Sequence, residues 1–208
     1  MRRLWGEYVR RREARANLKT TLALQLHGLF PEFLSTWADL FSAGPLAVLR
    51  TGLTPAVIAQ LSYSEFAGRV RLHHQGRRLW LPKLRQLHAK AQQTVACPAG
   101  MDALAREARR LVARVDLLTT QMVELQREIE AQLADLPEAA HLASIPGLAW
   151  ASVAGILAHV GHIAKSRHGR QLIKLAGTNP SRRNSGQAVG PRTPMTHRGR
   201  AGLRAVLY

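Results

Sequence analysis

Residues 102–136 carry an apolar repeat that restricts the fold more than any other feature of the sequence. Apolar side chains recur in alternating steps of four and three residues, at Leu104, Ala108, Leu111, Val115, Leu118, Met122, Leu125 and Ile129. This spacing places one apolar seam along a helix, which Gln132 interrupts before Leu136. Leu at every second seam position, with branched residues at some of the others, favours a parallel two-stranded coiled coil. We therefore predict a dimerising coiled coil over 101–137. The alternatives are one amphipathic helix in a bundle, or an intramolecular hairpin of two helices.

The chain before this repeat also has the signals of helices. Residues 2–29 have apolar side chains at helical spacing among many arginines, and a second helical stretch at 32–42 is expected to end at Gly44-Pro45. Thr54 is expected to cap a helix that begins with a proline, and Ser62 or Ser64 to cap the next one. We therefore predict a helical N-terminal region over 1–100.

The composition agrees with a mainly α fold. Only 5% of the residues are aromatic, and Leu and Ala fill most apolar positions, which favours helices over sheets. The four tryptophans, Trp5, Trp37, Trp80 and Trp150, are interpreted as local packing anchors. The predicted architecture is the helical region over 1–100, the long coiled coil over 101–137, and a compact basic helical domain over 138–208.

Positive charge indicates a polyanionic partner. The formal net charge is +17, and residues 139–208 contain ten Lys and Arg residues and no Asp or Glu. Such a segment repels itself unless a polyanion such as nucleic acid binds it. A generic basic protein, for example a ribosomal one, is the alternative. A membrane is not expected as a partner, because the basic segment contains turns and glycines, and no apolar run approaches the ~20 residues of a spanning helix.

The cysteine and histidine content argues against a metal site in this chain. Cys97 is the only cysteine, which excludes a disulfide framework and a cysteine-rich zinc site and fits a reducing, cytoplasmic location. No Cys or carboxylate completes a ligand set with His73 and His74, or with His159 and His162. These histidines are interpreted as surface or phosphate-contacting residues, and the sequence predicts no metal and no cofactor bound by this chain.

Residues 142–162 have the pattern of a helix-hairpin-helix. A short helix leads into Pro146-Gly147, and a second helix of small residues runs from Ala149 to Val160. In such an element the tight turn presents backbone N–H groups to a DNA phosphate, so Pro146 and Gly147 are predicted DNA contacts. Ala149 stands where the usual hairpin has a second glycine. A plain helical hairpin with a Pro-Gly turn is the alternative.

Two further motifs complete the C-terminal segment. QLIKLAGTNPSRRNSGQAVG at 171–190 predicts a short helix ended by Gly177 and then a polar, basic loop, and THRGRAGLRAVLY at 196–208 begins another helix. The order IPG, LAHVG, QLIKLAGTNP, SG and THRGRAGLRAVL resembles the C-terminal transposase domain of the insertion sequence 110/116/902 family. RRREARANLKTTLALQLHGLFPEF, LTPAVIAQLSYSEF and the coiled-coil helix resemble the segment that precedes this domain in the family. The resemblance thus spans nearly the whole chain.

The resemblance implies a serine nucleophile at Ser185. A serine oxygen can attack a DNA phosphate and hold it as phosphoserine, and Gly186 would let the backbone turn sharply beside it. Arg182 and Arg183 would neutralise charge on the phosphoryl oxygens. Without the resemblance, Ser-Gly would be an ordinary turn. The predicted DNA contacts also include Arg198 and Arg200, and weaker nucleic-acid contacts are expected from Arg10, Arg11, Arg12 and Arg15.

The resemblance implies DNA transposition or site-specific recombination. In the family, strand transfer through the serine is combined with an N-terminal RuvC-like domain whose DEDD carboxylates bind Mg²⁺. The carboxylates of this chain are scattered, so that domain is expected to precede residue 1, and the last helix to continue beyond Tyr208. The chain is therefore expected to be a fragment of a transposase.

Partners and location follow from the same resemblance. It implies DNA, a structured guide RNA from the element's own ends, and a homodimer or higher oligomer through 102–136. It also implies a bacterial, nucleoid-associated location. The competing hypothesis is a catalytically incomplete transposase remnant, which only binds nucleic acid or dimerises with the full-length enzyme.

Overall fold

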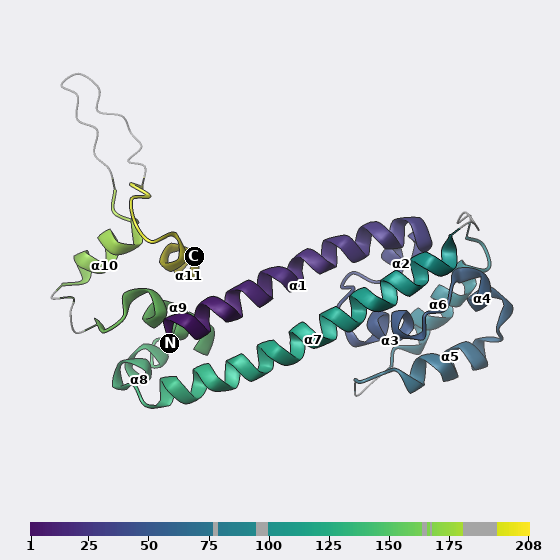
Figure 1. Ribbon diagram of the computed structural model, residues 1–208, viewed down its shortest axis with the longest axis horizontal. Coiled ribbons are helices and arrows are strands. Elements are labelled where there is room, and N and C mark those ends of the chain that lie inside the picture. Colours follow the sequence, from purple (N-terminus) through teal and green to yellow (C-terminus); the bar gives the residue numbers. More distant parts are fainter. Residues whose placement is uncertain (77–78, 95–99, 164–165, 167, 181–194) are drawn as a thin grey trace, which may run out of the picture. The chain divides into compact units, whose positions relative to one another are not determined.

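The computed structural model describes all residues except 77–78, 95–99, 164–165, 167 and 181–194, and in this part the chain is helical (Figure 1). The mainly α prediction is confirmed. The helices are α1 (Arg2–Leu29), α2 (Pro31–Thr36), α3 (Ala43–Thr51), α4 (Pro55–Gln60), α5 (Tyr63–Leu72), α6 (Leu81–Ala91), α7 (Met101–Ala134), α8 (Pro137–Ala143), α9 (Trp150–Val160), α10 (Gly169–Ala176) and α11 (Ala201–Leu207). None of these helices is both long enough and apolar enough to cross a membrane, over the residues that the structure describes.

The chain forms two compact units. The central unit comprises Arg11–Gln121, and the C-terminal unit comprises Met122–Tyr208 together with Met1–Arg10. These units differ from the ranges 1–100, 101–137 and 138–208 that the sequence suggested. The reason is that α1 and α7 are long helices, and each contributes one end to each unit.

In the central unit, α1 and α7 run antiparallel (Figure 1). Near one end Arg11 Nε donates to Gln121 Oε1 at 3.2 Å, whereas near the other Gly28 lies against Leu104. The core that these two helices share with the other helices of the unit consists of aliphatic and aromatic side chains. Leu22 and Leu26 of α1 have no exposed surface and belong to the same buried cluster as the N-terminal half of α7.

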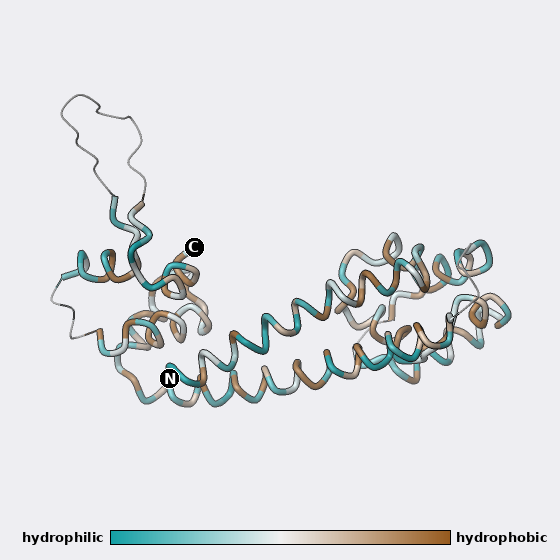
Figure 2. The backbone as a smooth tube through the Cα atoms, turned by 45° about the horizontal axis from the view of Figure 1, so that its top comes forward, coloured by the Kyte–Doolittle hydropathy of each residue, from teal (hydrophilic) through white to brown (hydrophobic). Residues whose placement is uncertain are grey.

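Much of the α7 seam is buried within the chain. Ala108, Leu111 and Val115 lie in the core of the central unit, and the adjacent Ala105 and Val112 are buried with them. This widened apolar face is typical of a helix in a globular bundle, and Figure 2 shows apolar and polar residues alternating along it. The packing is that of one amphipathic helix in a bundle, which was left open as an alternative. An intermolecular coiled coil over 102–136 stays a prediction.

The C-terminal end of α7 continues the seam with different residues from those predicted. Leu125, Ile129 and Leu133 are buried in the C-terminal unit, in a cluster that also contains Trp5. Leu133 therefore takes the place expected for Leu136, which is only partly buried. Because the buried residues Leu125, Ile129 and Leu133 follow one another in steps of four, Gln132 falls on a different face of the helix and is exposed.

The predicted helix starts after residue 50 are confirmed. Thr54 Oγ1 accepts from Val57 N at 3.4 Å ahead of α4, and Ser62 rather than Ser64 caps α5 in a capping box with Glu65.

The predicted helical stretch over 32–42 is confirmed only in its first part, as α2, and its predicted end is wrong. α2 ends at Thr36, and Gly44 and Pro45 lie in the first turn of α3, where proline is tolerated because its missing N–H has no intrahelical acceptor there. Gly44 also faces the Trp37 ring: a Cβ on Gly44 would lie 2.8 Å from that ring. The Gly-Pro pair therefore begins a helix instead of ending one.

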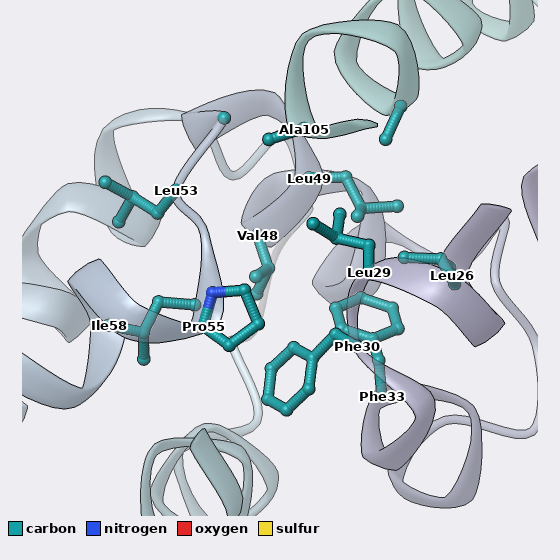
Figure 3. Close-up of a pocket in the computed structure, with 12 residues that line it drawn as sticks. Leu26, Leu29, Phe30, Phe33, Val48, Leu49, Leu53, Pro55, Ile58 and Ala105 are labelled. Carbon is teal, nitrogen blue, oxygen red and sulfur yellow. The ribbon is translucent and has the colours of Figure 1, made fainter. Parts of the chain in front are cut away.

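The core of the central unit leaves almost no internal space. Figure 3 shows apolar side chains from several helices, including Phe30, Phe33 and Ile58, converging on a cavity of about 10 Å³. A cavity of this size holds one water molecule at most, and no polar side chain lines it. This cavity, lined by residues between Leu26 and Ile58 and by Ala105 and Ala108 of α7, is therefore a small packing gap and not a binding site.

Candidate nucleic-acid interface

The C-terminal unit is organised around α9. Buried residues occupy α9 continuously from Val153 to Ala158, because α8, α11 and the start of α1 cover it from several sides. Two glycines permit the contact with α11. A Cβ on Gly155 would meet Val206 at 2.7 Å and Trp5 at 2.9 Å, and a Cβ on Gly202 would lie 2.4 Å from the His159 ring. The small residues that the sequence placed on this helix thus serve packing against α11 and α1 as well as against α8.

Gly177 ends α10 in the left-handed conformation, with φ of +69°. Thr178 N donates to Ile173 O at 3.1 Å, and Gly177 N donates to Lys174 O at 3.0 Å. This pair of hydrogen bonds is the Schellman motif, which glycine accommodates without steric cost. The predicted end of this helix at Gly177 is confirmed.

Beyond α10, two backbone segments pair and form a neck, defined here as residues 177–180 and 195–200. Thr196 N donates to Asn179 O at 3.0 Å, His197 N to Gly177 O at 3.0 Å, and Arg200 N to Leu175 O at 2.7 Å. Pro180 and Met195 lie opposite each other in an antiparallel bridge. The chain therefore leaves and re-enters the described fold at neighbouring points.

The neck depends on a close contact between two glycines. A Cβ built on Gly199 would lie 2.3 Å from Gly177 N, 2.5 Å from the Ala176 carbonyl carbon and 2.6 Å from Leu175 O. All three are backbone atoms, which cannot rotate away as a side chain does. Only glycine fits at position 199 with this pairing intact.

Four predicted site residues lie outside the described residues. Ser185, the predicted nucleophile, falls within 181–194, as do Arg182, Arg183 and Gly186. The structure describes the two points at which this segment joins the neck, Pro180 and Met195.

The predicted arginine contacts of the neck differ in their surroundings. Arg198 is exposed, whereas Arg200 Nη1 donates to the His159 carbonyl at the end of α9. Arg204, which the sequence reasoning did not single out, donates from Nη1 to Ala176 O at 3.0 Å and to His197 O at 3.4 Å. Arg200 and Arg204 therefore brace the neck against α9 and α10. Arg198 and Arg200 are both exposed, and Arg204 is partly buried.

The turn between α8 and α9 is exposed. Ile145, Pro146 and Gly147 face solvent, Leu148 N donates to Ile145 O at 3.2 Å, and Gly147 has φ of +91°. Proline followed by a glycine of positive φ is the pattern of a type II turn. Ala149 has φ of −75°, a conformation open to any residue, so alanine in place of the usual second glycine does not disturb this backbone.

The start of α9 has backbone donors without a side-chain cap. Ala149 offers no capping oxygen, and the first bonds back to its carbonyl come from Ser152 and Val153. The N–H groups that precede them point out of the helix, where they can donate to an anion.

The N-terminal arginines are spread over both units. Arg10 and Arg12 are exposed. Arg11 is bonded to Gln121 as described above, and Arg15 Nε donates to Thr119 Oγ1 at 3.2 Å while its guanidinium lies over Phe41. Arg11 and Arg15 thus stabilise the α1–α7 pair as well as contributing charge.

Negative charge is scarce in the C-terminal unit beyond α7. Glu138 is its last carboxylate, 3.9 Å from His162 Nδ1. Among the described residues, no three His, Cys, Asp or Glu side chains are grouped closely enough to hold a metal ion.

His159 connects the stability of this unit to pH. Burial lowers the pKa of His159 below its ordinary value, and the charges of Arg2 and Arg200 lower this pKa further. The unfolded chain therefore binds more protons than the folded chain at pH values below about 6.5. Stability from the neutral ring is fully present above that pH and is lost as pH falls towards the folded pKa.

We expect the C-terminal unit to unfold at lower denaturant concentration at pH 5.5 than at pH 7.5. The comparison is made by chemical unfolding at both pH values for the unchanged chain, His159→Asn and His168→Asn. Because Asn does not titrate, His159→Asn should reduce the difference between the two pH values. His168 is exposed in the same unit, and its variant should keep the full difference. An unchanged difference in His159→Asn would show that other groups cause the acid sensitivity.

Comparison with known families supports the predicted family resemblance of residues 139–208. Residues 139–208 match the family described as Transposase IS116/IS110/IS902 family, which confirms the resemblance predicted from the motif order. The matched residues run from α8 through α11 and include the whole neck. Searches of curated proteins and of solved structures gave no match. This region therefore has a function related to transposition.

Proposed function

We propose that this chain, whose residues 139–208 form a transposase domain of the IS116/IS110/IS902 family, binds DNA and transfers strands through Ser185. The observation that carries the proposal is the neck. Its paired backbone holds Pro180 and Met195, the described residues on either side of 181–194, opposite each other. Phosphoryl transfer depends strongly on how the nucleophile is held, and the neck is proposed to contribute to the positioning of Ser185.

In the proposed step, Ser185 Oγ attacks a DNA phosphorus and its hydroxyl proton is lost. The bond from phosphorus to the 3′ oxygen breaks, and that oxygen leaves as a hydroxyl after taking up a proton. The phosphoserine conserves the energy of the broken phosphodiester. A different 3′ hydroxyl then attacks the phosphoserine, which forms the new phosphodiester and restores the serine. Arg182 and Arg183 would offset negative charge on the phosphoryl oxygens.

DNA is proposed to lie against the exposed parts of the C-terminal unit. The Pro146-Gly147 turn and the uncapped N–H groups of α9 suit a phosphate, and Arg198 is exposed on the neck. Arg200, predicted as a contact, donates within the fold and is proposed to act mainly by holding the neck.

Other parts of the proposal come from the family resemblance alone. They are a RuvC-like partner domain that binds Mg²⁺, a structured guide RNA, and a homodimer through 102–136. The described residues do not fit a Mg²⁺ site, and no step above uses one. A metal-binding domain is proposed to join the complex from outside residues 1–208.

The serine assignment is tested by trapping the covalent intermediate. The chain is mixed with a full-length relative and end-labelled DNA, and protein-bound label is measured on a denaturing gel. Ser185→Ala should lower the adduct formed on this chain by at least ~10³-fold, because removal of a nucleophile abolishes the covalent path. Ser181→Ala, four residues away in the same segment, is the matched control and should keep the adduct.

Two other results are informative. Equal adducts from Ser185→Ala and the unchanged chain would mean that another residue is the nucleophile. Binding that weakens with salt, without an adduct from any version, would favour the competing hypothesis of a remnant that only binds nucleic acid.

A further inference from the structure

Trp80 is exposed, contrary to the interpretation of the tryptophans as packing anchors. Its side chain is 61% exposed, whereas Trp5 and Trp37 are each 6% exposed. It immediately precedes α6 in the central unit, outside the residues that match the transposase family. Leu79, Trp80, Leu81 and Pro82 line a surface hollow of about 560 Å³. An indole left open beside a hollow of this size indicates a bound partner, because burying its large apolar surface would be favourable.

Cations accompany the aromatic rings at this surface. Lys83 Nζ lies 5.2 Å from the centroid of the Trp80 ring and 5.1 Å from that of Trp37. The Arg85 guanidinium lies 5.0 Å from the centroid of Tyr63, whose hydroxyl donates to Leu81 O at 3.2 Å. Trp80, Leu81 and Lys83 thus lie together and form the surface named here the Trp80 surface. Arg85, two residues after Lys83 on α6 and packed on Tyr63, points to another side of the helix.

Carboxylates hardly offset this charge. Glu65 is the only Asp or Glu between residues 61 and 94, and its carboxylate accepts from the backbone and hydroxyl of Ser62. In the part of the chain that the structure describes, Lys83 and Arg85 form no ion pair. The Trp80 surface is therefore complementary to a polyanion.

We infer that the Trp80 surface binds single-stranded nucleic acid, with an unpaired base stacked on the Trp80 ring and a flanking phosphate beside Lys83. An aromatic platform next to an unpaired cation suits this ligand, because every base has a flat face and every linkage carries a negative charge. A duplex presents its phosphates but keeps its bases stacked inside, so it cannot use the indole in this way. The inference goes beyond the proposed function, since it concerns the central unit and does not depend on Ser185.

The test measures binding of the full chain to fluorescent single strands by anisotropy. The probes are oligo-dT, oligo-rU and a matched abasic deoxy strand. Trp80→Ala should weaken binding of oligo-dT or oligo-rU by ~5- to 100-fold, as expected for the loss of one stacked base. Trp80→Tyr should restore most of the affinity. Leu72→Ala removes another exposed apolar side chain of the same unit, 85% exposed, and should bind as the unchanged chain does.

The abasic strand separates stacking from charge. It should bind equally weakly to Trp80→Ala and to the unchanged chain, because it has no base to stack. Comparing oligo-dT with oligo-rU shows whether the natural ligand is DNA or RNA. Duplex DNA should bind Trp80→Ala and the unchanged chain equally. The serine test measures a covalent adduct and the Trp80 test measures single-strand binding, so a failure of one is distinguishable from a failure of the other. Equal affinity of Trp80→Ala and the unchanged chain for both oligo-dT and oligo-rU would overturn the inference. So would an equal loss on the abasic strand, because Trp80 would then act without a stacked base.

Discussion

Gly199→Ala is expected to destabilise the C-terminal unit by about 3 kcal/mol, at the upper end of the usual cost of overpacking. The new methyl group would lie 2.3–2.6 Å from backbone atoms of residues 175–177, so one of the two segments has to move. That movement breaks the hydrogen bonds from His197 N to Gly177 O and from Arg200 N to Leu175 O. Chemical unfolding gives the free energy, and hydrogen exchange of α10, the neck and α11 locates the change.

Gly169→Ala is the matched control for this substitution. Gly169 lies in the first turn of α10, and a Cβ there would meet no atom within 4 Å. Alanine restricts the unfolded chain more than glycine does, so this variant should be as stable as the unchanged protein or slightly more stable. If Gly199→Ala unfolds at the same denaturant concentration as Gly169→Ala, the glycine contact does not hold the neck. Under the proposed function, Gly199→Ala should also lose the covalent adduct although Ser185 is intact.

Leu22→Ala is expected to destabilise the central unit by about 2–5 kcal/mol. Leu22 has no exposed surface and lies in the cluster that joins α1 to the N-terminal half of α7. Truncation removes buried methyl groups and leaves a cavity, because the surrounding helices cannot fully close it. Leu24→Ala is the control on the same helix: Leu24 is 69% exposed, and its truncation should change stability by about 0.5 kcal/mol or less.

The same unfolding experiment examines how the α7 seam is covered. If the seam packs against α1 within one chain, the midpoint of unfolding of the central unit should be independent of protein concentration. An obligate coiled-coil dimer would instead unfold at higher denaturant concentration as the protein concentration rises. A large effect of Leu24→Ala, equal to that of Leu22→Ala, would contradict the buried face assigned to α1.

Local signals in the sequence were sufficient for much of the secondary structure. Ser62 and Glu65 stand three residues apart and form the capping box by themselves, and Gly177 ends α10 because its own backbone takes the left-handed form. Gly44-Pro45 was misinterpreted, because the same pair is allowed in the first turn of a helix. The contact between the Trp37 ring and position 44, which favours glycine there, cannot be inferred from the local sequence.

The candidate site was predictable in its residues but not in its arrangement. The motif order pointed to Ser185 and to the family that residues 139–208 match. It did not indicate that Arg200 and Arg204 donate to backbone carbonyls, because an arginine in a basic segment has the same sequence signal whether it contacts DNA or braces the fold. The exposed indole of Trp80 was missed for a similar reason, since tryptophan is buried in most local contexts.

The sequence by itself determined the helical class, the main caps and the excess of positive charge, because each depends on residues close together in the chain or on composition. The tertiary structure decided which partner covers the α7 seam, and it brought Gly177 against Gly199 and Gly155 against Val206. These contacts join residues that are distant in sequence. An apolar seam specifies that it must be buried but not by which helix, and a glycine shows freedom of the backbone but not the neighbour that requires it.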